Sequence, residues 1–308
     1  MLSFIKLIRF PNLIIIILTQ YLTRFCILQP LLKSQGISLQ FSELDFFLLV
    51  LSTILIAGAG YIINDYFDLK IDNINKTEKI IIGRKISIKN SIILYVLMNV
   101  IAIGVGFYIS QKVGNIKYVL IFVFIGFILL FYSAKYKNKF LSGNLIVSFL
   151  SAFVIIIVWI YEILALGKNQ ISIASQWEIM KLLVFGYSIF AFLVSLAREI
   201  IKDIQDVEGD RTFGCRTIPV VIGMKNSKLI VVGITIFTML ILAYGQYLFY
   251  IYENNFICFY FILVQSLFIY LIYTIIKANE IKDFYFTGNL SKLIMLAGIL
   301  SMLFLLIK

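Results

Sequence analysis

Long apolar runs alternate with short polar segments along the whole of this chain. Each run is long enough to cross the roughly 30 Å of hydrocarbon in a lipid bilayer as an α-helix. The runs also lack the polar face that a surface helix of a soluble protein shows. Nine are predicted to span the membrane: 12–32, 44–65, 90–111, 116–134, 141–166, 178–201, 227–250, 255–277 and 288–307. We therefore expect an all-α integral membrane protein of nine transmembrane helices, with residues 1–308 forming a single polytopic domain.

The two longest polar connections, 66–89 and 202–226, follow the second and the sixth run, and each carries a group of acidic residues. Four runs separate the two connections, so both emerge on the same side of the membrane. In each, a helix end is followed by acids, then by basic residues, then by the next helix. This repetition predicts two related helix groups, roughly 1–140 and 141–308, in a bundle around a central cavity.

Composition and charge add an orientation to this picture. Of the 308 residues, 61% are hydrophobic and 14% are charged, against about 25% charged in a soluble protein. Most Lys and Arg fall on one side if the N-terminus is cytoplasmic, which predicts a multi-pass cell-membrane protein with both acidic segments in the cytoplasm and an external C-terminus. The net charge of +11 then indicates contact with membrane lipids. Nucleic acid binding is not expected, because the basic residues lie in short loops.

The acidic residues recur at helical spacing. If the helices continue through both segments, the side chains at i, i+4 and i+8 of the first and at i, i+3 and i+7 of the second share one face. Stacked carboxylates repel each other unless a cation lies between them, and Mg²⁺ is commonly shared between carboxylates and substrate phosphates. The predicted Mg²⁺ ligands are Asn64, Asp68, Asp72, Asp203, Asp206 and Asp210. Of these, Asp68, Asp72, Asp206 and Asp210 are the predicted catalytic residues.

Basic and polar residues near the acids are predicted to meet an anionic substrate. The predicted substrate-binding residues are Asn64, Lys79, Arg84, Tyr132, Lys137, Arg198 and Lys202. A diphosphate neutralised from both sides loses its bond to an allylic carbon more easily, and the apolar interior would hold a prenyl tail. Aromatic rings would shelter the resulting carbocation, the candidates being Tyr61, Tyr66, Phe67 and Tyr132. For each Lys or Arg taken singly, a role in orientation alone is an equal alternative.

Isolated residues inside the apolar runs carry further expectations. Arg24 either reaches the outer interface or points into the cavity, and the cavity is favoured. Glu162 is expected at the interface, and Gly58, Gly60, Gly104 and Gly106 are expected to allow close helix packing. The chain has no histidine, which excludes imidazole bases and His-ligated metals. Its three cysteines predict neither a disulfide nor a metal site.

The two acidic signatures, Asn64-Asp65-x-x-Asp68-x-x-x-Asp72 and Asp203-x-x-Asp206-x-x-x-Asp210, resemble those of the UbiA superfamily of intramembrane prenyltransferases. Arg9-Phe10-Pro11-Asn12 and Tyr132-Ser133 with Lys137 are also similar to family features, and the resemblance covers nearly the whole chain. It implies a nine-helix fold open laterally to lipid, Mg²⁺-dependent polyprenyl transfer, and donor binding by the predicted Mg²⁺ ligands. One departure concerns the loop after the first signature, where Lys79 stands in place of the family's usual arginine and both prolines are absent.

The segment Ala197–Arg211, together with Arg216-Thr217-Ile218-Pro219, is the sequence feature from which the acceptor is predicted. It is similar to the subgroup that alkylates a glycerol-phosphate hydroxyl, so we expect transfer from geranylgeranyl diphosphate, or another prenyl diphosphate donor, to a lipophilic ether-lipid alcohol such as geranylgeranylglycerol phosphate. Arg198 and Lys202 would suit an acceptor with its own phosphate. An aromatic acceptor of quinone biosynthesis is the alternative within the same class. A cation-coupled transporter is the alternative outside it, although transporter sites lie near the bilayer midplane.

Overall fold

The structure, a computed structural model, describes residues 2–75, 80–171 and 177–307, and these residues are almost entirely helical. The elements are α1 (Leu2–Leu7), α2 (Phe10–Leu22), η1 (Thr23–Leu28), α3 (Gln29–Lys33), α4 (Glu43–Phe67), α5 (Leu69–Asn75), α6 (Ile88–Lys112), η3 (Ile116–Tyr118), α7 (Val119–Phe131), η4 (Tyr132–Tyr136), α8 (Ser142–Ile171), α9 (Trp177–Gln205), α10 (Val207–Thr212), α11 (Ile218–Ile251), α12 (Asn255–Lys277), α13 (Ile281–Leu300) and η5 (Ser301–Leu306).

The expected number of spans is confirmed within the described residues: nine helices, some in consecutive pieces, are long and apolar enough to cross a membrane. Two of them begin seven or more residues earlier than predicted. The seventh begins at Ile218, because Pro219 suits a first helical turn, and it bends at Gly223, where φ is 81°. The ninth begins at Ile281, because Glu280 and Asp283 form a reciprocal capping box ahead of it.

Several helix starts follow from serine or asparagine caps in the sequence. Ser42 accepts a hydrogen bond from the backbone N–H of Asp45 at the start of α4, and Ser87 does the same for Asn90 at the start of α6. Asn254 caps α12 through the N–H of Ile257. These caps satisfy N–H groups that would otherwise be left without partners at the bundle ends.

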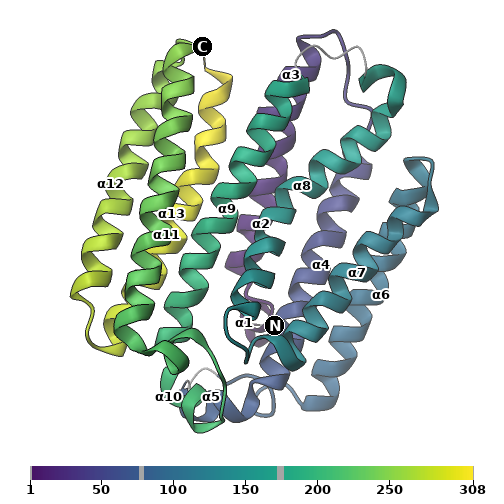
Figure 1. Ribbon diagram of the computed structural model, residues 1–308. Helices are drawn as coiled ribbons and strands as arrows, with labels where there is room; N and C mark the ends of the chain where they lie inside the picture. The colour runs from purple at the N-terminus through teal and green to yellow at the C-terminus, as the bar shows by residue number, and fades with distance from the viewer. Residues whose placement is uncertain (1, 76–79, 172–176, 308) are drawn as a thin grey trace.

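The helices form one bundle with α9 at its centre (Figure 1). α9 packs against α8, α11, α13 and η1, while α4 packs against α6 and α7 on the other side of the bundle. One large core joins α2, η1, α4, α6, α7, α8 and α9, and a second joins α9 with α11, α12 and α13. α5 and α10 lie at one end of the bundle and the C-terminus at the opposite end (Figure 1).

The outer surface is apolar as well as the core. Phe124, Leu240 and Phe259 are 65%, 64% and 72% exposed, which is the pattern expected of side chains that face lipid. The apolar runs therefore supply both the inside and the outside of the bundle. The side of the membrane on which α5 and α10 lie, and the division into groups 1–140 and 141–308, stay predictions.

Candidate active site

Both acidic segments begin where a long helix ends. α4 ends at Phe67 and α5 follows Asp68, whose N–H donates to Asn64 O at 3.0 Å; Asp72 N–H then donates to Asp68 O at 2.8 Å. In the second segment α9 ends at Gln205 and α10 follows Asp206. The i to i+4 backbone bonds continue through each junction, so the spaced side chains stay one turn apart.

The second segment repeats this backbone pattern. Asp206 N–H donates to Lys202 O and Asp210 N–H donates to Asp206 O, both at 3.0 Å. Asp68 and Asp206 therefore occupy the same place, the junction between a spanning helix and a short one. α5 and α10 pack against each other, at the same end of the bundle (Figure 1). The fold thus brings together two acidic segments that lie far apart in the sequence.

Donors from other helices hold the acidic side chains. Asp68 accepts from Asn64 Nδ2 at 2.8 Å and forms an ion pair with Lys137. Asp203 accepts from Asn144 Nδ2 at 2.8 Å, and Asp210 accepts from Thr217 Oγ1 at 3.0 Å. These bonds fix the carboxylates to α8 and to the start of α11 as well as to their own helices.

Residues 132–141, which comprise η4 and the loop that leads to α8, join the two acidic segments. Lys137 reaches Asp68 of the first. Asn138 O accepts a hydrogen bond from the backbone N–H of Arg216, just after the second, at 2.8 Å. Next to it, Cys215 is buried, and its burial, with Asp210 adding, raises the pKa of its thiol to about 11. This connection therefore ties the ends of both acidic segments together.

A cavity of about 230 Å³ runs into the bundle from this end. Most of its wall is aliphatic or aromatic, with Ile15, Ile56, Phe122 and Phe153 among the lining residues. Its polar and charged lining residues are Arg9, Asn12, Thr19, Thr53, Tyr61, Asn64, Tyr132, Ser151, Ser195, Arg198, Glu199, Lys202 and Lys292. Such a space suits an amphiphile with a long apolar chain and an anionic head.

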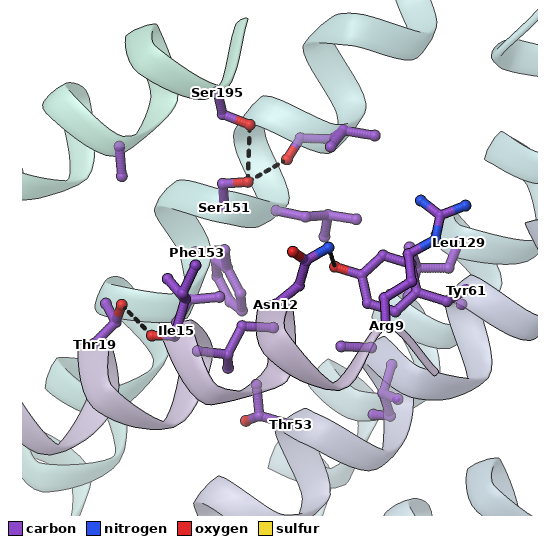
Figure 2. Close-up of a pocket in the computed structure, with 18 of the residues that line it drawn as sticks. Arg9, Asn12, Ile15, Thr19, Thr53, Tyr61, Leu129, Ser151, Phe153 and Ser195 are labelled. Carbon is purple, nitrogen blue, oxygen red and sulfur yellow. Dashed lines mark hydrogen bonds between the residues drawn. The ribbon is translucent and has the colours of Figure 1, made fainter. Parts of the chain in front are cut away.

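Arg9 helps to build the polar part of the cavity. Its backbone is left-handed, with φ 50°, between α1 and α2. Its guanidinium lies 4.9 Å from the ring centre of Tyr61, and Nη2 is 2.7 Å from Asp65 Oδ1. Figure 2 shows Arg9 beside Tyr61, whose hydroxyl accepts from Asn12 at 3.4 Å. Asp65 therefore points away from Asn64 and holds the guanidinium of Arg9 at the cavity.

Three cations on α9 and α13 line the same cavity. Glu199 Oε1 accepts from Arg198 Nη1 at 3.0 Å and from Lys202 Nζ at 2.6 Å. Lys292 of α13 also lines the cavity. A carboxylate shared by two cations neutralises one of them, so this wall keeps a net positive charge.

The residues present fit a hard divalent cation. Within the described ranges, no group of three or more Asp, Glu, Cys or His side chains stands close enough to form a complete metal cage. One oxygen ligand is nevertheless left open: Asn64 Oδ1 is buried and has no hydrogen-bond partner among the described residues. Oxygen ligands are those that Mg²⁺ prefers, and the ion usually completes its shell with water and substrate phosphate.

Not every predicted substrate-binding residue reaches the cavity. Tyr132, Asn64, Arg198 and Lys202 line it, and Lys137 reaches Asp68. Arg84 is exposed, next to a turn at Gly83, and lies outside the cavity lining. Lys79 lies outside the described residues. Of the aromatic candidates, Tyr61 and Tyr132 line the cavity, whereas Tyr66 and Phe67 do not.

Two expectations inside the apolar runs were wrong. Arg24 does not line the cavity: it is 1% exposed and its Nε lies 3.0 Å from Glu162 Oε1. Its partner Glu162 is also 1% exposed and so is buried inside the protein, and its depth in the membrane stays a prediction. The cause is pairing, because each charge makes the burial of the other possible. The second wrong expectation is close packing at Gly104, which is exposed and where a side chain would meet nothing within 4 Å.

Five residues that shape the site were not among the predicted ones: Arg9, Asn12, Asn144, Glu199 and Lys292. Arg9 and Asn12 belong to the Arg9-Phe10-Pro11-Asn12 sequence, which was noticed but given no role. Lys292 had a signal of its own, because it is a lone charge about one turn inside the predicted span 288–307. Asn144 and Glu199 had none, since their roles depend on which helices pack together.

The chain is similar to a known protein family over most of its length. The model described as "UbiA prenyltransferase family" matches residues 34–304. Digeranylgeranylglyceryl phosphate synthase of Methanothermobacter thermautotrophicus is 35% identical over 189 residues, 59% of this chain and 58% of that protein. The protein of the same description from Methanobrevibacter smithii is 33% identical over 70% of this chain and 71% of its own length. The chain thus spans less than two thirds of the first relative.

Solved structures share the fold at lower identity. A structure from work on digeranylgeranylglyceryl phosphate synthase in membranes superposes with a TM-score of 0.62 at 22% identity, covering 99% of this chain and 96% of that one. A UbiA homolog from Archaeoglobus fulgidus bound to DMAPP and Mg²⁺ gives a TM-score of 0.55 at 16% identity, covering 97% and 99%. These likenesses concern the arrangement of the nine spans.

Proposed function

Because the chain belongs to the UbiA prenyltransferase family, we propose that it transfers a geranylgeranyl group from its diphosphate to the hydroxyl of geranylgeranylglyceryl phosphate. The observation that carries this proposal is the apolar cavity whose polar lining adjoins two acidic segments from distant parts of the chain. Relatives described as digeranylgeranylglyceryl phosphate synthase support the choice of donor and acceptor. A transporter is not retained, because the family is one of prenyltransferases.

The acidic segments would hold Mg²⁺ through Asn64, Asp68, Asp72, Asp203, Asp206 and Asp210. The Archaeoglobus homolog bound to DMAPP and Mg²⁺ supports the choice of Mg²⁺ as the ion. When bound, Mg²⁺ neutralises the charge that builds on a departing diphosphate. Asn64 contributes the open oxygen Oδ1, and Lys137, which already pairs with Asp68, adds positive charge beside it.

The remaining lining residues bind the chain and protect the reacting carbon. In the reaction the allylic carbon–oxygen bond to diphosphate breaks, an ether bond to the acceptor oxygen forms, and the hydroxyl proton leaves. The aliphatic wall holds the isoprenoid and excludes water, which would otherwise capture the allylic cation. The rings of Tyr61 and Tyr132 face this space and are placed to stabilise positive charge by cation–π contact.

The test is geranylgeranyl transfer in membranes that contain the protein, supplied with labelled geranylgeranyl diphosphate, geranylgeranylglyceryl phosphate and Mg²⁺. We expect Asp68→Asn to lower turnover by about 100-fold or more, because it removes a charge at the donor head. Chelation of Mg²⁺ by EDTA should abolish turnover in the unchanged protein.

Glu208→Gln is the control, since Glu208 is an exposed acid of the second acidic segment and is not among the proposed Mg²⁺ ligands. It should retain wild-type turnover and expression. Wild-type turnover in Asp68→Asn would refute the role of Asp68, and transfer to an aromatic acceptor in place of the glyceryl phosphate would refute the acceptor.

A further inference from the structure

A second, smaller cavity of about 150 Å³ lies between α9 and α13. Arg198, Lys202 and Lys292 line it, and the same three residues also line the large cavity. Its other polar lining residues are Gln205, Tyr285 and Asn289. The two cavities therefore share a wall formed by three cations, two from α9 and one from α13.

The packing register of α9 and α13 places these cations together. A side chain at Gly288 would meet Gln205 Nε2 at 2.8 Å and Ile201 at 3.8 Å, and one at Gly298 would overlap the ring of Phe190. The two helices are thus antiparallel, and the register sets Lys292 beside Arg198. Gln205 Nε2 also donates to Phe284 O at 2.7 Å, which fixes this register at the end of α9.

The cations of this wall are not fully neutralised by the protein. Glu199 pairs with Arg198 and Lys202, but among the described residues Lys292 has no carboxylate within ion-pair distance. Arg198 Nε is buried and has no hydrogen-bond partner in the described part of the chain. Three cations thus share one carboxylate, which leaves about two positive charges for a ligand to neutralise.

Their depth makes this excess significant. Lys292 lies about 16 Å along α13 from its first residue, and Arg198 about 10 Å along α9 from its last, at 1.5 Å per residue. Charges inside a membrane domain are costly unless they are paired or functional. A bound anion with a charge near −2 would remove the excess.

We propose that this small cavity is the binding site for the phosphate monoester of the acceptor lipid, distinct from the site of the donor diphosphate. The assignment rests on the proposed function. A phosphate monoester carries about −1.5 to −2 charges at neutral pH and offers three acceptor oxygens. Arg198 Nε, Lys202 and Lys292 supply donors for such a group, and arginine is well suited to phosphate geometry.

The lining distinguishes this phosphate from the donor's. None of the described residues that line the small cavity is an Asp or a Glu, so it has no carboxylate ligands for the metal that accompanies a diphosphate. The acidic segments lie instead at the ends of α4 and α9. The shared cations place the acceptor head next to the large cavity, where the donor chain is held.

Lys292→Met tests the assignment, because it removes a charge without leaving a carboxylate unpaired. Purified protein without donor is titrated with geranylgeranylglyceryl phosphate and with geranylgeranylglycerol, which lacks the phosphate. We expect the wild type to bind the phosphorylated lipid about ten-fold tighter or more, and Lys292→Met to lose most of that preference. Lys292→Arg should keep most of it. Lys282→Met, at an exposed position of the same helix, should behave as wild type.

Three results would overturn the assignment. One is a wild-type preference for the phosphate retained in Lys292→Met. Another is an equal loss, in Lys292→Met, of affinity for a non-hydrolysable geranylgeranyl diphosphate analogue, which would show that these cations bind the donor. The third is displacement of the acceptor by equimolar dioleoyl phosphatidate, which would show that the cavity binds membrane phospholipid without selecting the acceptor.

Turnover separates this inference from the proposed function. If the wild type transfers no geranylgeranyl group to the phosphorylated acceptor, the proposed function fails. The binding titrations still show whether the small cavity binds the phosphate, because they need no reaction. If transfer occurs, Lys292→Met should raise KM for the phosphorylated acceptor about ten-fold while KM for the donor changes less than about two-fold. An unchanged acceptor KM would refute the phosphate site alone.

Discussion

Arg24 and Glu162 lie inside the bundle, and each is 1% exposed. Arg24 also donates to the backbone oxygen of Phe41 and lies 4.3 Å from the ring centre of Phe46. The pair thus connects η1 to α8 and to the segment before α4. Because neither Arg24 nor Glu162 lines the cavity, the role of this ion pair is structural.

At this scale we predict that Glu162→Gln destabilises the protein by about 3–5 kcal/mol, because Arg24 then stays buried without its main counter-charge. Thermal unfolding in detergent measures the change. Glu178→Gln is the control: Glu178 pairs with Lys181 at 2.6 Å but is 80% exposed, so its loss should cost less than about 1 kcal/mol. A double variant, Arg24→Met with Glu162→Met, should recover most of the stability. Equal unfolding temperatures for Glu162→Gln and Glu178→Gln would contradict this account.

Among the helices, the contact between α6 and α7 depends on one glycine. A side chain at Gly106 would overlap the buried ring of Phe122, whereas one at Gly104, two residues earlier, would meet nothing within 4 Å. Gly58 and Gly60 of α4 are close to Met98 and Leu129 in the same manner. Three of the four glycines expected to allow close packing do so.

The two glycines of α6 form a matched pair. Gly106→Ala should destabilise the protein by about 1–3 kcal/mol, since the buried ring of Phe122 must shift to admit the added methyl group. Gly104→Ala should be neutral or stabilising by up to about 1 kcal/mol, because alanine favours a helix more than glycine does. Thermal unfolding of both variants in the same detergent decides the matter, and a loss of stability in Gly104→Ala would show that α6 packs differently.

Helices could be predicted from the sequence far better than the contacts between them. Apolar length alone placed all nine spans, and helical spacing placed Asp68 and Asp206 at corresponding positions. The spacing could not show that Lys137 would pair with Asp68, or that Asn144 would hold Asp203, because those bonds depend on the packing of separate helices. Arg24 was misplaced for the same reason, since its partner lies on α8.

For the molecule as a whole, the outstanding prediction is its orientation. The excess of Lys and Arg near α5 and α10 predicts that this end faces the cytoplasm. Single cysteines in place of Lys139 and Lys117, which are exposed and lie at opposite ends of the fourth span, can be labelled in intact cells with a membrane-impermeant maleimide. We expect labelling at position 117 and none at position 139 until the cells are opened.

Background labelling of Cys215, the native cysteine in the loop after α10, should be low. Burial raises the pKa of Cys215 to about 11, so on the order of one thiol in ten thousand is ionised at pH 7, and the thiolate is the reactive form. Cys26 and Cys258 are replaced by alanine as a control for the spans. The reverse labelling pattern would place the acidic segments outside the cell.

The hydrogen bond from Arg216 N–H to Asn138 O joins main-chain atoms only. Exchanging either side chain leaves the backbone donor and acceptor intact, so residues 138 and 216 can change during evolution while the link between the two acidic segments stays in place. Proline at 216 is the exception, because it has no amide hydrogen to give. The link between the two acidic segments therefore does not depend on which side chains stand at its two ends.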